Sequence, residues 1–220
     1  MDRLLTVLDR YISDFGIEKA CVGPLLAQGR QHMIYRYKDT HVIKIPQRSF
    51  YMLAYGGLTY DEILAEVKIL KTFLSEFVPE TDVLPAETHE GYVIIQKFVP
   101  HFAFVTPGNL AFVADDFHKI MRGNQAIIQA HAFSLDLLGN KGLQASLAAT
   151  LLRQKDRALM NNVLLVKHDE GYSVRIVDFN LLHLKERRNS KKVNRFRHVV
   201  DRVCFDLSRH LLKSHFNLQL

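Results

Sequence analysis

Two charged residues of this sequence stand inside apolar runs, where a charge is costly unless it has a partner. Lys44 lies in the strand-like run VIKIP, and Glu66 lies between Ile63 and Leu70 on the apolar face of a helix-like stretch. An inward carboxylate requires a cation, and Lys44 on the preceding strand is the expected partner. Two simpler interpretations stay open: Lys44 reaches water from an edge position, and Glu66 is solvated at the margin of the apolar stripe.

A third charge, Asp178, ends the strand-like run RIVDF. A carboxylate is a hard oxygen ligand, and proteins commonly bind Mg²⁺ through one or two carboxylates together with water. Asn162 stands immediately before VLLV, the first strand of a hairpin whose second strand leads to Asp178. An asparagine before one strand and an aspartate after the next form a more specific pattern than either residue alone.

The order of these residues and the elements that carry them resemble the protein-kinase-like superfamily, which includes minimal bacterial protein kinases and the aminoglycoside and choline kinases. The residues that carry the resemblance are Lys44, Glu66, Asn162 and Asp178. The resemblance runs over about residues 25–182. It implies that the chain binds ATP with Mg²⁺. The lysine–glutamate pair would position the α- and β-phosphates, Asp178 would bind the phosphate-bridging Mg²⁺, and Asn162 would supply a second metal contact.

Two further segments extend the resemblance. AQGRQHMIY resembles the glycine-rich loop, although only Gly29 is kept and Ala27 and His32 occupy the other two glycine positions. Such a loop works through backbone N–H groups, so it can still hold phosphate without those glycines. QKFVP resembles the hinge, which implies that Gln96 and Phe98 contact the cofactor.

The catalytic aspartate has two candidates. The superfamily usually places it five residues before the metal-binding asparagine, and that position here is Arg157, which cannot act as a base. Asp156 is one residue out of register. Asp136, in HAFSLDLLGN, follows a predicted long helix as the catalytic aspartate of kinases does, and Asn140 nearby is an alternative metal ligand. We favour Asp136, which requires a helix to be inserted before Asn162.

Hydrophobic periodicity predicts the elements that hold these residues. Several stretches repeat apolar residues at helical spacing, and one begins with the capping-box pattern Thr59–Glu62. β-rich runs around tight polar turns predict two hairpins, and a further buried strand ends at Pro100. The predicted helices are 2–15, 59–77, 111–133, 143–157 and 193–216, the hairpins lie within 25–45 and 163–179, and the strand is 91–100.

Strand-rich segments come first and helix-rich segments later, which predicts an α+β fold. With the resemblance, this indicates a bilobal protein-kinase-like fold. Residues 1–98 would form a small β-rich N-lobe that contains the lysine strand, the glutamate helix and the hinge strand. Residues 99–220 would form a helical C-lobe that contains the catalytic-loop region, the metal-binding hairpin and a basic last helix.

The composition, 48% hydrophobic and 24% charged, is that of a globular protein. The net charge of +6 is concentrated in KERRNSKK at 185–192, which favours anionic partners or, more simply, a solvated surface. Cys21 and Cys204 are far apart and predict neither a disulfide framework nor a zinc site. The sequence shows no signal peptide and no apolar run long enough to span a membrane. We therefore expect a cytoplasmic protein, or one delivered into a host cell.

We predict an ATP- and Mg²⁺-dependent phosphotransferase that acts on a hydroxyl of a protein or a small molecule. No APE-type segment follows Asp178, so a long peptide-docking platform is missing. The alternative is a pseudokinase that binds nucleotide or a partner without turnover, because the glycine-rich loop is eroded and the base is displaced. Nucleic-acid binding ranks last, because neither a stacking aromatic array nor a helix-turn-helix accompanies the basic tail.

Overall fold

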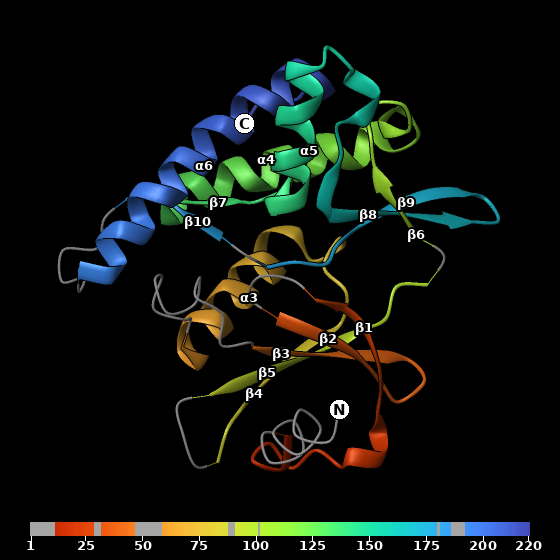
Figure 1. Ribbon diagram of the computed structural model, residues 1–220, viewed down its shortest axis with the longest axis vertical. Helices are drawn as coiled ribbons and strands as arrows, with labels where there is room; N and C mark the ends of the chain where they lie inside the picture. The colour runs from red at the N-terminus through yellow and green to blue at the C-terminus, as the bar shows by residue number, and fades with distance from the viewer. Residues whose placement is uncertain are drawn as a thin grey trace. The chain divides into compact units, whose positions relative to one another are not determined.

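The computed structural model describes residues 12–28, 32–46, 59–87, 91–100, 102–179, 181–185 and 192–220, the last with side chains from residue 197. The expected α+β class is confirmed (Figure 1). The chain contains two compact units. The first consists of Met1–Val67 and Glu80–Phe98, and the second of Lys68–Pro79 and Val99–Leu220.

The first unit is built on an antiparallel sheet of five strands in the order β1-β2-β3-β5-β4. The first predicted hairpin is confirmed, because β2 pairs with β3 and Lys38 takes a φ of 49° at the turn between them. β3 ends at Pro46, which has no N–H to donate to a neighbouring strand. The elements are η1 (Lys19–Cys21), β1 (Val22–Gln28), β2 (His32–Tyr37), β3 (His41–Pro46), β4 (Thr81–Pro85) and β5 (Tyr92–Lys97).

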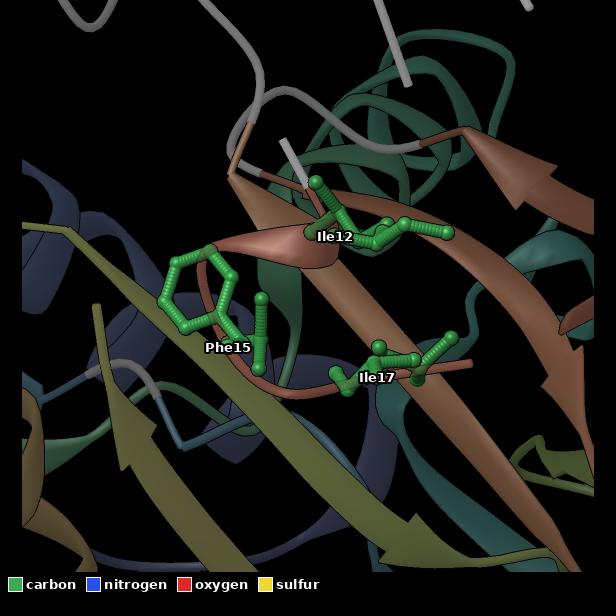
Figure 2. Close-up of a cluster of buried hydrophobic side chains, with 6 residues drawn as sticks. Ile12, Phe15 and Ile17 are labelled. Carbon is green, nitrogen blue, oxygen red and sulfur yellow. The ribbon is translucent and has the colours of Figure 1, made fainter. Parts of the chain in front are cut away.

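One face of this sheet packs against residues 12–17, whose apolar side chains lie over the strands in Figure 2. The buried cluster comprises Ile12, Phe15, Ile17, Ile43, Ile45 and Val93. Because successive side chains of a strand point to opposite faces, Lys44 points to the other face of the sheet. The predicted helix 2–15 lies mostly outside the described residues, and Ile12 and Ser13 are helical in the part that is described.

The helix that carries Glu66 begins with the predicted capping box. Thr59 donates its N–H to the Glu62 carboxylate at 3.0 Å, and Glu62 donates its N–H to Thr59 Oγ1 at 3.3 Å. The helix itself, α3, is Tyr60–Leu74, and the boundary between the two units falls after its residue Val67. The predicted start of this helix is therefore confirmed.

The second unit combines helices with two small antiparallel sheets. In one sheet the order is β6-β8-β9, and in the other β7 pairs with β10. Among the described residues, no helix is long and apolar enough to cross a membrane. The elements are β6 (Phe102–Val105), η2 (Leu110–Val113), α4 (Ala114–His131), β7 (Phe133–Leu135), α5 (Gly139–Leu151), η3 (Lys155–Arg157), β8 (Met160–His168), β9 (Gly171–Ile176), β10 (Leu181–His183) and α6 (Lys192–Phe216).

Two of the predictions for elements of this unit are confirmed and one is wrong. β8 and β9 form the second predicted hairpin, and α6 matches the predicted last helix. The helix predicted at 143–157 is instead α5, Gly139–Leu151. Its first turn is polar and glycine-containing, so the apolar periodicity does not reveal it, and the helix ends earlier because Arg153 takes a φ of 54° just beyond it. Asp156 therefore lies outside this helix.

Gly123, which weakens the pattern of α4, marks a close approach between helices. A Cβ added there would lie 3.0 Å from the Phe73 carbonyl oxygen and 3.1 Å from Leu74 Cγ. A glycine costs a helix about 1 kcal/mol relative to alanine. At this position the missing side chain lets α4 pack directly against the end of α3.

Candidate functional site

The strand that leads to Asp136 is fixed by a buried asparagine of α4. Asn124 Oδ1 accepts a hydrogen bond from the Leu135 N–H at 2.8 Å, and its Nδ2 donates to Ser134 Oγ at 3.3 Å. Asn124 and Ser134 are fully buried. Asp136 thus follows a strand, β7, whose last two residues are held by hydrogen bonds to a buried side chain. Nothing in the sequence distinguished Asn124 from an ordinary polar helix residue.

The Asp136 carboxylate lies at the beginning of α5. Its Oδ1 accepts the Gly139 N–H at 2.9 Å, and Gly139, the first residue of α5, has a φ of +62°. That left-handed conformation favours glycine. The N-terminal end of a helix carries a partial positive charge, which stabilises a nearby carboxylate. Asp136 is half-buried, so its carboxylate is oriented by the loop rather than freely rotating in water.

Asn162, the third residue of β8, is joined to the same loop. Its Nδ2 donates to the Asp136 carbonyl oxygen at 2.7 Å, and its own N–H donates to the Leu137 carbonyl at 3.4 Å. A Cβ added to Gly139 would lie 2.8 Å from Asn162 Cγ and closer still to Oδ1. The side chain of Asn162 is therefore packed against the backbone of the Asp136 loop.

The backbone that leads to Asp178 is hydrogen-bonded to the strand that carries Asn162. The Val177 N–H donates to the Asn162 carbonyl at 3.0 Å, which places the residue before Asp178 beside Asn162. β10 then pairs with β7 in antiparallel register, with Leu181 opposite Leu135. Because Asp136 directly follows Leu135, β7 leads to Asp136 at the end of this strand pair where β10 begins. These backbone bonds place the three segments that carry Asp136, Asn162 and Asp178 next to one another.

Asp156, the other candidate base, lies elsewhere. It is the middle residue of η3 and is exposed, between exposed Lys155 and Arg157. The contacts that join the Asp136 loop to Asn162 do not include η3. Of the two aspartates, the structure thus brings Asp136 next to Asn162.

The oxygen atoms of this cluster suit a small hard cation. Asn162 Oδ1 and the Asp178 carboxylate are both oxygen ligands of the kind that Mg²⁺ accepts. Since Nδ2 of Asn162 is held by the Asp136 carbonyl, the orientation of Oδ1 is set in advance, on the side where Gly139 has no side chain. Asn140, in the first turn of α5, is half-buried next to Gly139. These residues offer oxygen ligands of the kind that a magnesium ion accepts, and among the residues that the structure describes no three His, Cys, Asp or Glu side chains gather into a metal-binding group.

In the first unit, Lys44 and Glu66 are both buried, with 6% and 2% of their surface exposed. Lys44 stands between Ile34 of β2 and Ile94 of β5 in the sheet register. Neither charged side chain is without an interaction partner. The two interpretations in which these charges are solvated are therefore wrong, and buried charges of this kind require pairing.

The remaining predicted cofactor contacts have partners inside the first unit. Gln96 is buried and its Nε2 donates to Thr81 Oγ1 at 3.3 Å. The Phe98 N–H donates to the Thr40 carbonyl at 2.9 Å, and the Arg36 guanidinium lies 4.1 Å from the centre of the Phe98 ring. These groups are engaged in holding the sheet together. Gly29 lies outside the described residues.

His32, at a glycine position of the predicted phosphate loop, is buried at the start of β2. Its Nε2 lies 3.1 Å from Tyr92 Oη, and the two rings meet edge to face with their centroids 5.9 Å apart. A buried, hydrogen-bonded imidazole fixes this end of the loop to β5. His32 therefore has a structural role in the sheet, which a flexible glycine at the same position would not have.

A second polar cluster that sequence reasoning missed joins α6 to β10. Asp201 Oδ2 accepts the His183 N–H at 3.1 Å, while His198 Nδ1 donates to the His183 carbonyl at 3.0 Å. Arg197 Nε lies 3.5 Å from Asp201 Oδ2. Burial raises the pKa of Asp201, although Arg197 and the His183 N–H act to lower it. Side chains of α6 thus bind both backbone polar groups of the last residue of β10.

Comparisons with known proteins give remote matches only. No family model matches the chain, and no curated protein matches it. The streptomycin–ATP–APH(2")-IIa ternary complex is similar at 16% identity and a TM-score of 0.34, over 68% of this chain and 51% of that chain. The gentamicin–APH(2")-IIa complex is similar at 14% identity and a TM-score of 0.39, over 95% of this chain and 85% of that chain.

The chain therefore spans about half the length of the first of these structures. Both matched structures are complexes of APH(2")-IIa. Identity and TM-score are low for both. The roles assigned to individual residues rest on the contacts within this chain.

Proposed function

We propose that this chain is an ATP- and Mg²⁺-dependent phosphotransferase that transfers the γ-phosphoryl group to a hydroxyl of a protein or a small molecule. The observation that carries the proposal is the cluster of Asp136, Asn162 and Asp178. A 2.7 Å hydrogen bond joins Asn162 to the Asp136 backbone, and Val177, the residue before Asp178, donates its N–H to the Asn162 carbonyl at 3.0 Å. The proposed location is an ATP-rich compartment, the cytoplasm of its own cell or of a host.

Phosphate binding is assigned to the proposed N-lobe, residues 1–98. Lys44 would contact the α- and β-phosphates, because a buried lysine on a central strand is a strong point charge for an anion. Glu66 would orient the Lys44 ammonium. Backbone N–H groups around Gly29 would add to phosphate binding, and Gln96 and Phe98 would border the adenine.

Metal binding is assigned to Asn162 and Asp178 of the proposed C-lobe, residues 99–220. When bound there, Mg²⁺ would neutralise charge on the phosphates. The part played by the chain is to hold the amide oxygen of Asn162 and the carboxylate of Asp178 in place. The Asn162 hydrogen bond to Asp136 serves this purpose, because it leaves only one orientation for the amide.

Asp136 would act on the acceptor. The acceptor oxygen forms a bond to the γ-phosphorus as the bond from that phosphorus to the leaving oxygen of ADP breaks. The proton of the acceptor hydroxyl passes to the Asp136 carboxylate and later to water. The Gly139 N–H, bound to one carboxylate oxygen at 2.9 Å, keeps the aspartate oriented during this transfer.

The test separates the roles by isosteric substitutions. Asp178→Asn, Asp136→Asn and Asp156→Asn each remove one charge, and the exposed Asp156 serves as the matched control. Binding of Mg·ATP is measured by titration calorimetry. Turnover is measured as release of phosphate from γ-labelled ATP to water, which requires no knowledge of the acceptor.

Asp178→Asn should weaken Mg·ATP binding by at least about tenfold, because it removes a charged metal ligand. Asp136→Asn should leave binding nearly unchanged and slow transfer by about 10²–10⁴-fold, the usual contribution of a general base. Asp156→Asn should change neither. Absence of Mg·ATP binding by the unmodified protein, or a larger effect at Asp156 than at Asp136, would refute the assignment.

A nucleotide-binding module without turnover is the second candidate, and the geometry of His32 favours it. A buried histidine bonded to Tyr92 occupies a position where the superfamily keeps a glycine. The same experiment decides between the two functions. Mg·ATP binding that depends on Asp178, combined with no phosphate release in any variant, would favour this module over the enzyme.

A further inference from the structure

The outer face of α6 carries a ridge of exposed aliphatic side chains. Val199, Val203 and Leu207 recur at every fourth residue and are 58%, 53% and 36% exposed. Residues four apart lie one above the other on the same side of a helix. We call these three residues the α6 ridge. The opposite side of the helix is buried, through Phe205, Ser208 and Leu212.

Cations flank the α6 ridge. Arg202, Arg209 and Lys213 are exposed on α6, and His210 is exposed beside them. Asp206 is the acidic residue that α6 exposes within its described side chains, and its carboxylate lies 3.6 Å from Arg202 Nε. The exposed surface is therefore both aliphatic and net positive.

The sequence around this helix concentrates the charge of the whole chain. Residues 185–213 contain ten Lys or Arg and three Asp or Glu, a net charge of +7. The whole chain carries +6, so the remaining residues are close to neutral. An even distribution would be expected if this charge served only to keep the protein in solution. Its location in the sequence, on α6 and directly before it, favours an anionic partner.

We propose that the outer face of α6 docks on an anionic lipid surface. The ridge enters the boundary between headgroups and acyl chains, and the flanking cations bind headgroup phosphates. A helix with an apolar line and a cationic polar face is the usual form of such interfacial binding. A nucleic acid would match the cations but would leave the three aliphatic side chains in water. The lipid surface buries them.

The proposal is independent of phosphotransfer, and its test uses no ATP. The full chain is sedimented with vesicles of phosphatidylcholine alone and with vesicles of equal parts phosphatidylcholine and phosphatidylglycerol. A short DNA duplex provides a parallel anionic ligand without an apolar layer. The unmodified protein should bind the mixed vesicles, bind the neutral vesicles much less, and lose binding as salt rises.

Two double variants separate the ridge from the charges. Val199→Ser with Val203→Ser should lower the vesicle partition coefficient by about tenfold, because the two side chains no longer gain from burial. Arg202→Gln with Arg209→Gln should lower it by about fivefold per charge. Leu151→Ser is the matched control: Leu151 is a fully described, highly exposed leucine at the end of α5, and its loss should change nothing.

All four substituted positions of the double variants are exposed, so the fold should persist, and circular dichroism checks that it does. The proposal is overturned if the ridge variant binds mixed vesicles as well as the unmodified protein does. It is also overturned if the protein binds the duplex but not the vesicles, an outcome that would assign the basic surface to nucleic acid. The absence of vesicle binding would not alter the interpretation of the Mg·ATP measurements. The absence of Mg·ATP binding would likewise not alter the interpretation of vesicle binding.

Discussion

Gly139 provides the sharpest test of the Asp136–Asn162 arrangement, because its substitution has two separable costs. Gly139→Ala forces an L-residue into a φ of +62°. It also places a Cβ 2.8 Å from Asn162 Cγ, whereas ordinary contact begins at 3.4 Å. The alanine cannot be accommodated unless the Asn162 side chain moves. That movement breaks the 2.7 Å bond to the Asp136 carbonyl.

The two costs have different sizes. An alanine in the left-handed region costs about 1–2 kcal/mol. The Asp136 carbonyl then loses its donor inside the protein, which adds about 1–3 kcal/mol. Gly16→Ala isolates the first cost, because Gly16 has a φ of +64° and a Cβ there would meet nothing within 4 Å. We expect Gly139→Ala to destabilise the fold by about 2–5 kcal/mol and Gly16→Ala by only about 1–2 kcal/mol.

A double-mutant cycle in urea unfolding measures the clash directly. In an Asn162→Ala background the added Cβ has no side chain to displace, so the cost of Gly139→Ala should fall to that of the backbone alone. The expected coupling is about 1–3 kcal/mol. Calorimetric titration with Mg·ATP should show weaker binding for Gly139→Ala and unchanged binding for Gly16→Ala. Additive effects of the two substitutions in the cycle would refute the close packing of Gly139 on Asn162.

Two further predictions concern residues that position the site. Asn124→Ala removes the acceptor of the Leu135 N–H and should cost about 2–4 kcal/mol of unfolding free energy. Single-turnover assays should then show slower phosphate release at nearly unchanged ATP affinity, whereas the exposed Gln125→Ala should change neither. Burial raises the pKa of Asp201, so its contribution to stability is greatest below its ordinary pKa of 3.8 and is lost as pH rises through the raised value. Thermal unfolding should therefore show the protein losing stability relative to Asp201→Asn between about pH 4 and neutrality, and a pH-independent difference would contradict this.

Elements specified by neighbouring residues could be predicted from the sequence. The capping box at Thr59–Glu62 is a contact between residues three apart, and both of its hydrogen bonds are present. Both predicted hairpins are also local, since their strands are joined by tight turns. The inward position of Glu66 could be inferred in the same way, because the 3.6-residue period of a helix fixes which side chains share its apolar face.

Contacts between distant segments could not be predicted. β7 and β10 have three residues each, too few for a periodic signal, and they pair across more than forty residues of sequence. The binding of His183 by Asp201 and His198 depends on that pairing and on the packing of α6. Asn124 and Gly139 owe their importance to what they touch, and no sequence pattern records those contacts. These contacts between distant segments nevertheless decide which aspartate lies next to Asn162.

The spacing between Asp136 and Asn162 shows why counting residues misleads at this site. The two are 26 residues apart, far more than the superfamily usually allows. The chain leaves after Leu138, forms α5 and η3, and returns. On return, the Asn161 N–H donates to the Leu138 carbonyl at 2.9 Å and the Asn162 N–H donates to the Leu137 carbonyl at 3.4 Å. The segment that contains α5 and η3 therefore begins and ends at the same place, where its two ends are hydrogen-bonded to each other. Because the two ends of this segment are joined, its length need not change the position of Asn162. Asp156, which satisfies the count more nearly, belongs to this segment and not to the proposed site.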